Sequence, residues 1–477
     1  MEKCSVLLKR IMLGILLGLL ALALCLAAWT GLTSHSYLAA LILGAVWAAL
    51  LVLLLRRRAL PVPDKAGLWV TLFCFVLNLV WVLLIRIEPF SDYETFWHVA
   101  CALANGTEIE SAWYIAMYPH ILGTATFLSV FVRLFGESVL AVAVVNVALT
   151  SLSCGLVWLL GKELFSREVG FLAALLWAVC PCKLMLNSLV FSEPLYTCLI
   201  LLFLWLFLLL SRRMKLGADG EKPVGAAVGI WALGLLLAAI NIVRPIAAIL
   251  LIAAAIWLVF LRGDEEKSGR LWCFWLAAFL AMTALFRVSG VLWDRHVENT
   301  LGMAPSGVPV YNIYVGFNED TQGQWSAEDM DLLFSYLSEE GVTTSEAQSR
   351  MWPHLRERLA SGIDFKRLFA SKLLAFLGND ELGGYTYRFT RPETFCKICM
   401  AVCNVFYYGV VLAAMAGLLR MLRSRALGAG QLLPLYVLGL TLAHMLVEVS
   451  NRYHYSIIPI LIIFAAAGLC GGERRNA

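Results

Sequence analysis

The chain has 477 residues, of which 61% are hydrophobic and only 15% are charged. In soluble globular proteins about a quarter of the residues are charged, and such proteins cannot hide this much apolar surface from water. The composition therefore excludes a soluble enzyme, a disordered protein and a fibrous repeat. Because the apolar runs are continuous rather than alternating, it predicts an all-α polytopic membrane protein and not an outer-membrane barrel.

About twelve runs approach the roughly 20 apolar residues that a membrane-spanning helix needs. The clear ones are 11–29, 37–55, 67–85, 138–161, 191–211, 225–242, 246–261, 271–289, 399–419, 431–447 and 455–470. A weaker run, 168–182, is short and ends at Pro181. The run 11–29 also has features of a signal peptide, but its length and its pairing with 37–55 favour a retained helix.

Residues 117–135 form a further run that is almost long enough to span. Counting it would reverse every later helix and place the basic stretch 212–215 outside, whereas positive charge near helix ends prefers the cytoplasm. His120 and Arg133 would also be costly inside a bilayer. We therefore expect 117–135 to be an interfacial or re-entrant segment on the outer surface.

The charges then divide unequally between the two sides of the membrane. With both termini cytoplasmic, the inner segments net +11 and the outer segments net −7, which together give the overall +4. We expect four regions: an N-terminal hairpin (1–66), a transmembrane core (67–289) with a first outer loop (86–137), a large outer loop (290–397) and C-terminal helices (398–477). The inner loops are too short for a nucleotide-binding domain, and the sequence has no GxxxxGK[ST] motif, so an ATP-driven pump is not expected.

The large outer loop has helical signals of its own. Ser326 is placed to cap a helix that ends before Gly341. Residues 363–378 are amphipathic, which fits either a helix on the membrane surface or ordinary packing against the loop. The thirteen cysteines lie largely within apolar runs, and Cys396, Cys399 and Cys403 lack partner ligands, so we predict no metal site there.

The residues that could carry chemistry cluster at the predicted outer ends of the helices. Asp92 follows the helix 67–85, where Ser91 and Glu94 have the spacing of a capping box and a carboxylate in the first turn would be favoured by the helix dipole. Basic side chains at this level could snorkel to headgroups or bind a lipid phosphate. They are Arg86, Lys183, Arg244 and Arg452.

Two further positions near these helix ends have alternative explanations. Glu193 begins the run 191–211, where an acid is either a functional group or a favourable N-terminal charge. Glu448, Tyr453 and His454 surround Arg452 in sequence and could simply pair with it.

The order of these features resembles the integral-membrane glycosyltransferases of the C superfamily (GT-C). The closest resemblance is to the dolichyl-phosphate-mannose protein mannosyltransferase family (family 39) and its bacterial members. It covers most of the chain from about residue 67 and is carried by order and topology rather than by one long motif. The matching segments are SDYETFWHVACALANG (91–106), YPHILG (118–123), LFGESVLAVAVVNVALTSLSCG (134–155), LFSREVGFLAALLWAVCP (164–181), SEPLYT (192–197), Arg244-Pro245, PVYNIYVGFNEDTQGQWSAEDMD (309–331) and NRYHYSIIP (451–459).

The resemblance implies transfer of a sugar from a polyprenyl-phosphate carrier to a protein, lipid or glycan acceptor on the extracytoplasmic face of the cell membrane. The acidic motif of the family maps to Asp92 and Glu94, although here Tyr93 separates the two acids. The outer-loop Pro-His element corresponds to Pro119-His120. No cofactor is required, and a divalent cation near Asp92, Glu94 or His120 is compatible with the sequence.

We therefore expect Asp92 to be the general base of an inverting transfer, with Glu94 as a second catalytic candidate. Arg244, Arg452 and Lys183 are the expected ligands of the donor phosphate. His120, Glu193 and Tyr453 are expected to contact substrate. The remaining alternatives are a polysaccharide polymerase or ligase, a transporter or flippase, and a membrane protein without catalysis.

Overall fold

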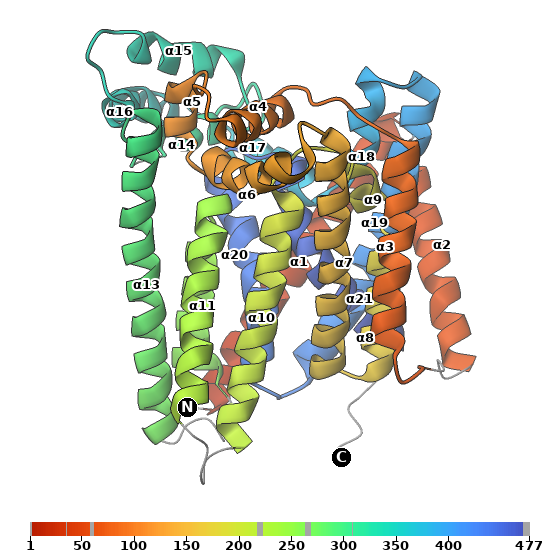
Figure 1. The fold of residues 1–477 in the computed structure, drawn as a ribbon. Coiled ribbons are helices and arrows are strands. Elements are labelled where there is room, and N and C mark those ends of the chain that lie inside the picture. The colour runs from red at the N-terminus through yellow and green to blue at the C-terminus, as the bar shows by residue number, and fades with distance from the viewer. Residues whose placement is uncertain are drawn as a thin grey trace.

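The structure is a computed structural model that describes residues 2–34, 36–57, 62–216, 223–262, 269–307 and 309–470, and every regular element in these ranges is helical. Ten of the described helical segments are long and apolar enough to cross a membrane, which confirms the expected polytopic all-α fold. Figure 1 shows them as a bundle. They are α1 (Glu2–Ser34), α2 (Ser36–Arg57), α3 (Ala66–Leu84), α7 (Val139–Leu164), α10 (Glu193–Leu216), α11 (Pro223–Val243), α13 (Gly269–Leu301), α19 (Glu393–Arg423), α20 (Leu432–Leu446) and α21 (Ile458–Cys470), the last two extended at their starts by the 3₁₀ turns Ala429–Gln431 and Asn451–Ile457.

The other two expected spans are shorter. Helix α12 (Ala247–Ile256) continues through a π turn to Leu261. Helix α8 (Arg167–Ala178) stops before Pro181, which starts α9 (Pro181–Leu186), because proline favours the first turn of a new helix over the interior of an old one. Figure 1 shows α8 toward the lower end of the bundle and α9 toward the upper end.

Segments that the charge distribution assigned to one side of the membrane do meet at one end of the bundle. The ammonium of Lys9 donates to the carbonyl oxygen of Ser424 at 2.6 Å. Arg167, at the start of α8, lies 3.4 Å from Asp64, just before α3. This is the lower end in Figure 1, where α1 begins and α21 ends.

The helices α19 and α21 pack most closely in the core, and glycine makes this possible. A Cβ atom on Gly417 would lie 2.0 Å from the carbonyl oxygen of Phe464, and one on Gly468 would lie 2.1 Å from that of Ala413. Only glycine at both positions lets the two backbones approach this closely, the arrangement typical of membrane helix pairs. Helix α21 is buried along its whole length.

Shorter helices cover the upper end of the bundle in Figure 1. Helix α6 lies across this end beside α4, and its 16 residues are fewer than any of the ten spanning segments has. That 117–135 lies on the outer membrane surface stays a prediction. The loop that follows α13 contributes most of the rest. The covering helices are α4 (Asp92–Asn105), α5 (Ala112–Met117), α6 (His120–Phe135), α14 (Val310–Gly316), α15 (Ala327–Leu337), α16 (Thr344–Ala360), α17 (Phe365–Leu377) and α18 (Leu382–Tyr385), the last followed by a 3₁₀ turn (Thr386–Phe389).

Two local predictions for these covering helices are resolved by the structure. The hydroxyl of Ser326 caps α15 by accepting from the backbone N–H of Asp329, and Gly341 adopts φ +80° beyond the end of the helix, as expected. Helix α17 packs against neighbouring segments of the protein, which is the second of the two alternatives. Its Lys372 is fully buried and donates to the backbone carbonyl oxygens of Gly316 and Val447.

The capping box predicted at Ser91 is wrong. Ser91 precedes α4 with φ 52°, and its side chain makes no capping hydrogen bond. Its backbone carbonyl oxygen instead accepts from the N–H of Glu94 at 3.0 Å. Serine in this left-handed region is strained, and such strain is most often kept where it positions a functional group. Here it sets the direction of the first turn of α4, which begins with Asp92.

Candidate active site

Four helix ends that lie far apart in sequence meet beneath the covering layer. Asp92 is the first residue of α4, and Glu193 is the first residue of α10. Arg244 follows the last residue of α11, where Pro245 stops the helix, and Arg452 lies in the 3₁₀ turn before α21. Each side chain stands at a helix terminus because the apolar spans themselves exclude charge.

Arg452 is the centre of this group. Its Nη2 atom donates to Oδ2 of Asp92 at 3.0 Å, across 360 residues of sequence. Its Nε atom lies 3.4 Å from Oε1 of Glu193, but no hydrogen bond forms, and both atoms are buried without a partner. The guanidinium group therefore lies between the carboxylates of Asp92 and Glu193, and its Nε–H makes no hydrogen bond.

The three charged side chains differ in their exposure. The side chain of Glu193 is 2% exposed and that of Arg452 is 15% exposed, whereas the side chain of Asp92 is 47% exposed. A buried charge must be compensated by a partner, which Glu193 and Arg452 provide for each other. Asp92 is the member of the group that an incoming substrate can reach.

Tyr453 connects Arg452 to the other predicted arginine. The guanidinium carbon of Arg244 lies 4.7 Å from the centre of the Tyr453 ring, and that of Arg452 lies 5.5 Å from it. Cation–π contacts of this kind are strongest when water is excluded. The Tyr453 hydroxyl donates to Glu448 at 3.2 Å, and burial raises the pKa of the Glu448 carboxyl.

His120, at the start of α6, belongs to the same region. Burial lowers the pKa of its imidazole well below the ordinary value, and the nearby charges of Arg244 and Arg452 lower it further. A neutral imidazole offers one hydrogen-bond donor and one acceptor, which an imidazolium cannot do. The structure thus brings Asp92, Arg452, Glu193, Arg244, Tyr453 and His120 to one place.

Two of the predicted site residues lie outside this group. Oε1 of Glu94 lies 3.9 Å from Nε2 of His98, on the exposed side of α4. Glu94 is two positions after Asp92 in the same helix, so the two side chains face different directions. Lys183 is buried inside the bundle, where its ammonium lies 3.3 Å from the carbonyl oxygen of Ala178 and 3.5 Å from the side-chain oxygen of Asn78. These contacts assign Lys183 to the interior of the bundle and not to the Arg452 group.

Sequence reasoning missed three tyrosines beside the cluster. Tyr93 is buried under Arg452, whose guanidinium carbon lies 5.7 Å from its ring centre, and burial raises the pKa of the Tyr93 phenol to about 12. Tyr114 and Tyr118 are in contact with each other, their ring centres 5.0 Å apart. Their spacing of four residues, which places both on one face of a helix, was the signal that could have found them.

The residues present do not form an evident cation site. Within the described ranges, no three His, Cys, Asp or Glu side chains come together in a way that could hold a metal ion. Asp92 and Glu94 have different partners, as described above.

Comparison with known proteins finds a family model that matches the central part of the chain. Residues 119–293 match the family model described as dolichyl-phosphate-mannose-protein mannosyltransferase. The matched stretch runs from the start of α6 through α13 and includes Glu193 and Arg244. No curated protein sequence matches the chain.

Solved membrane enzymes show a distant likeness. The archaeal oligosaccharyltransferase AglB from Archaeoglobus fulgidus, in complex with an inhibitory peptide and a dolichol-phosphate, aligns with a TM-score of 0.44 and 13% identity over 85% of this chain and 50% of its own. ArnT from Cupriavidus metallidurans, bound to undecaprenyl phosphate, aligns with a TM-score of 0.39 and 13% identity over 83% of this chain and 78% of its own. The chain spans about half the length of the archaeal enzyme.

The family match agrees with the resemblance that the sequence motifs carried. It covers the central part of the chain, from the covering helix α6 to the long helix α13. The chain is thus a multi-pass membrane protein whose residues 119–293 are similar to the dolichyl-phosphate-mannose-protein mannosyltransferase family.

Proposed function

We propose that this protein transfers a sugar from a polyprenyl-phosphate-linked donor to an acceptor hydroxyl, with inversion at the anomeric carbon. The observation that carries the proposal is the pairing of a reachable carboxylate, Asp92, with a buried guanidinium, Arg452, at 3.0 Å. One is a proton acceptor and the other is a phosphate ligand. The family match supports the reaction class.

The donor phosphate would bind at Arg452 and Arg244. Arg452 has a buried Nε donor without a hydrogen-bond partner, and guanidinium groups bind phosphate through two parallel hydrogen bonds. Arg244 contacts the same Tyr453 ring as Arg452 and adds a second positive charge. Glu193 would keep Arg452 oriented, since its carboxylate is buried against the guanidinium group.

Asp92 would act as the general base. When the phosphate replaces Asp92 as the partner of Arg452, the carboxylate becomes free to accept a proton from the acceptor hydroxyl. The hydroxyl oxygen forms a bond to the anomeric carbon from the face opposite the lipid. The bond from that carbon to the phosphate oxygen breaks, and the negative charge that develops on the departing phosphate is stabilised by the two arginines.

The neighbouring groups would orient the substrates. His120, held neutral by burial and by the two arginines, can donate or accept a hydrogen bond with a sugar hydroxyl. Tyr453 donates a hydrogen bond to Glu448, and its ring contacts both guanidinium groups. Glu94 and Lys183 have no role in this mechanism, because their contacts lie elsewhere.

The site would face the extracytoplasmic side of the cell membrane, with both termini in the cytoplasm. The charge division of +11 and −7 in the sequence supports this orientation. The covering helices would then close the site from the aqueous phase, and the acceptor would enter beneath or between them.

The test uses membranes that contain the protein and a labelled polyprenyl-phosphate sugar. Release of free polyprenyl phosphate reports transfer. We expect Asp92→Asn to lower this rate by about 10²–10⁴-fold, the usual contribution of a general base. Asp331→Asn on the exposed face of α15 makes the same chemical change away from the site and should leave the rate unaltered.

Two results would contradict the proposal. A near wild-type rate for Asp92→Asn would remove Asp92 as the base. A wild-type protein that releases no lipid phosphate from any polyprenyl-phosphate sugar would overturn the reaction itself.

A further inference from the structure

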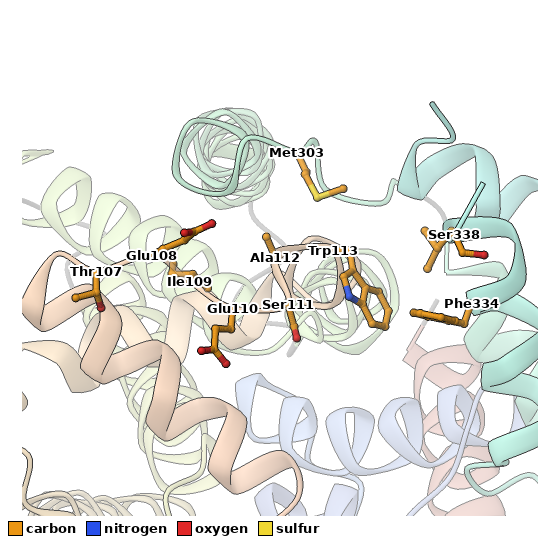
Figure 2. Close-up of a pocket in the computed structure, with 11 residues that line it drawn as sticks. Thr107, Glu108, Ile109, Glu110, Ser111, Ala112, Trp113, Met303, Phe334 and Ser338 are labelled. Carbon is orange, nitrogen blue, oxygen red and sulfur yellow. The ribbon is translucent and has the colours of Figure 1, made fainter. Parts of the chain in front are cut away.

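A large pocket lies in the covering layer, next to the candidate active site but separate from it. Its volume is about 960 Å³, at the upper end of the range for small-molecule sites. It lies between the loop that joins α4 to α5, the segment after α13, and α15. Figure 2 shows the rings of Trp113 and Phe334 beside each other on one side, with Glu108 on the other.

The walls of this pocket combine aromatic rings with carboxylates. Trp113 and Phe334 meet edge to face, with their ring centres 5.2 Å apart, and the Phe334 side chain remains exposed. Glu108 and Glu110 are exposed at its rim, and Met303 adds apolar surface. None of the described residues that line the pocket is basic.

This chemistry excludes one ligand class and fits another. Two carboxylates without a cation repel an anion, so the pocket does not suit the phosphate of a lipid donor. A neutral sugar chain fits both the aromatic rings and the carboxylates of the pocket. The carbon-bound hydrogens of a sugar pack against aromatic faces, and its hydroxyl groups donate to carboxylate oxygens in charge-assisted hydrogen bonds.

A continuous row of aromatic side chains leads from the pocket to the active-site cluster. From Phe334 and Trp113 it continues through Tyr114, 5.6 Å from Trp113, to Tyr118, a further 5.0 Å away, and then to His120 at 6.1 Å. The short helix α5 carries both Trp113 and Tyr114. These ring contacts connect the pocket to the cluster through side chains of α5 and the start of α6.

We propose that this pocket binds the distal sugars of a neutral glycan acceptor, whose terminal hydroxyl lies at Asp92. The inference rests on the proposed function, because it identifies the acceptor of that reaction. The phosphate-binding arginines and the acidic, aromatic pocket then divide the two substrates by charge: the lipid donor binds at one and the uncharged acceptor at the other.

The test is direct binding of neutral hexasaccharides, linear glucans and mannans, to the purified protein by calorimetry without donor. We expect Phe334→Ala to weaken binding about tenfold, the effect of losing one aromatic contact surface. Glu110→Gln should weaken it several-fold. Trp352→Ala, an exposed aromatic on α16 that does not line the pocket, should leave it unchanged.

A second measurement separates this inference from the proposed function. Release of polyprenyl phosphate with a monosaccharide glycoside as acceptor, which is too short to reach the pocket, should be the same in Phe334→Ala and wild type. If the wild type releases no polyprenyl phosphate in this assay, the proposed function is overturned. The hexasaccharide binding experiment then still tests the pocket assignment independently.

The outcomes of the binding experiment are equally distinct. Hexasaccharide binding that is equal in all variants, or absent from the wild type, would overturn the pocket assignment. Binding of a serine- and threonine-rich peptide in place of the hexasaccharides, lost in Phe334→Ala, would also overturn it and would assign the pocket to a polypeptide acceptor.

Discussion

At the scale of single residues, Arg452 has two tasks that mutation can separate. It neutralises Glu193, whose side chain is 2% exposed, and in our proposal it binds the donor phosphate. Removing one partner of a buried ion pair typically costs about 3–5 kcal/mol, because the other charge is left uncompensated. A loss of activity in a single Arg452 variant could therefore reflect a loss of folding.

A double-mutant cycle resolves this ambiguity. We expect Arg452→Gln to lower stability by about 3–5 kcal/mol and to abolish use of the donor. In the double variant Arg452→Gln with Glu193→Gln, no buried charge is left unpaired, so most of the stability should return. Activity should not return, because the phosphate ligand is still missing. Thermal unfolding in detergent and release of polyprenyl phosphate measure the two effects.

The cycle can also fail in an informative way. If the double variant regains activity together with stability, Arg452 serves folding alone and the phosphate must bind elsewhere.

At the scale of elements, the site depends on how closely α6 packs against α11. A Cβ atom on Gly123 would lie 2.2 Å from the carbonyl oxygen of Ile242. Gly123 stands one turn after His120, and Ile242 stands two residues before Arg244. The contact between these two backbones therefore sets the distance between two side chains of the cluster.

We expect Gly123→Val to displace α6 from α11, with a loss of stability of about 1–3 kcal/mol and a marked loss of sugar transfer. Gly14→Val is the matched control, since a Cβ atom there meets nothing within 4 Å. That change should leave stability unchanged or raise it slightly, because valine has a higher helix propensity than glycine. Thermal unfolding and lipid-phosphate release in both variants check this, and wild-type behaviour of Gly123→Val would show that α6 can move without disturbing the site.

At the scale of the whole molecule, the two ends of the bundle differ in character. The upper end in Figure 1 carries the covering helices. The cluster around Arg452 and the pocket are formed by residues of these helices and of the helix ends beside them. The charge distribution favours an extracytoplasmic upper end, and the proposed function requires it.

Accessibility labelling tests this orientation. Glu340, between α15 and α16, and Arg425, just beyond α19, are exposed at opposite ends. In intact cells a membrane-impermeant maleimide should label Glu340→Cys and should reach Arg425→Cys only after permeabilisation, with the unmodified chain as the baseline for its native thiols. The reverse pattern would invert the topology and remove the proposed access of an external acceptor.

Much of the fold could be predicted because the length of an apolar run and the sign of its flanking charges are local properties. They identified ten long spans and the short helix α6 that lies across the end of the bundle. The prediction of a capping box at Ser91 failed because it used residue spacing alone. The spacing of Ser91 and Glu94 is compatible with a capping box, but the backbone before α4 takes a left-handed turn that spacing does not record.

The sequence by itself determined that this is a multi-pass helical membrane protein and which charged residues stand at the ends of its helices, because a bilayer penalises charge anywhere else. Only the tertiary structure decided which of these charges meet. It joined Asp92 to Arg452 across 360 residues, turned Glu94 toward His98 and buried Lys183 among the helices. These distances follow from how the helices pack against one another, and packing depends on side-chain shapes from distant parts of the chain.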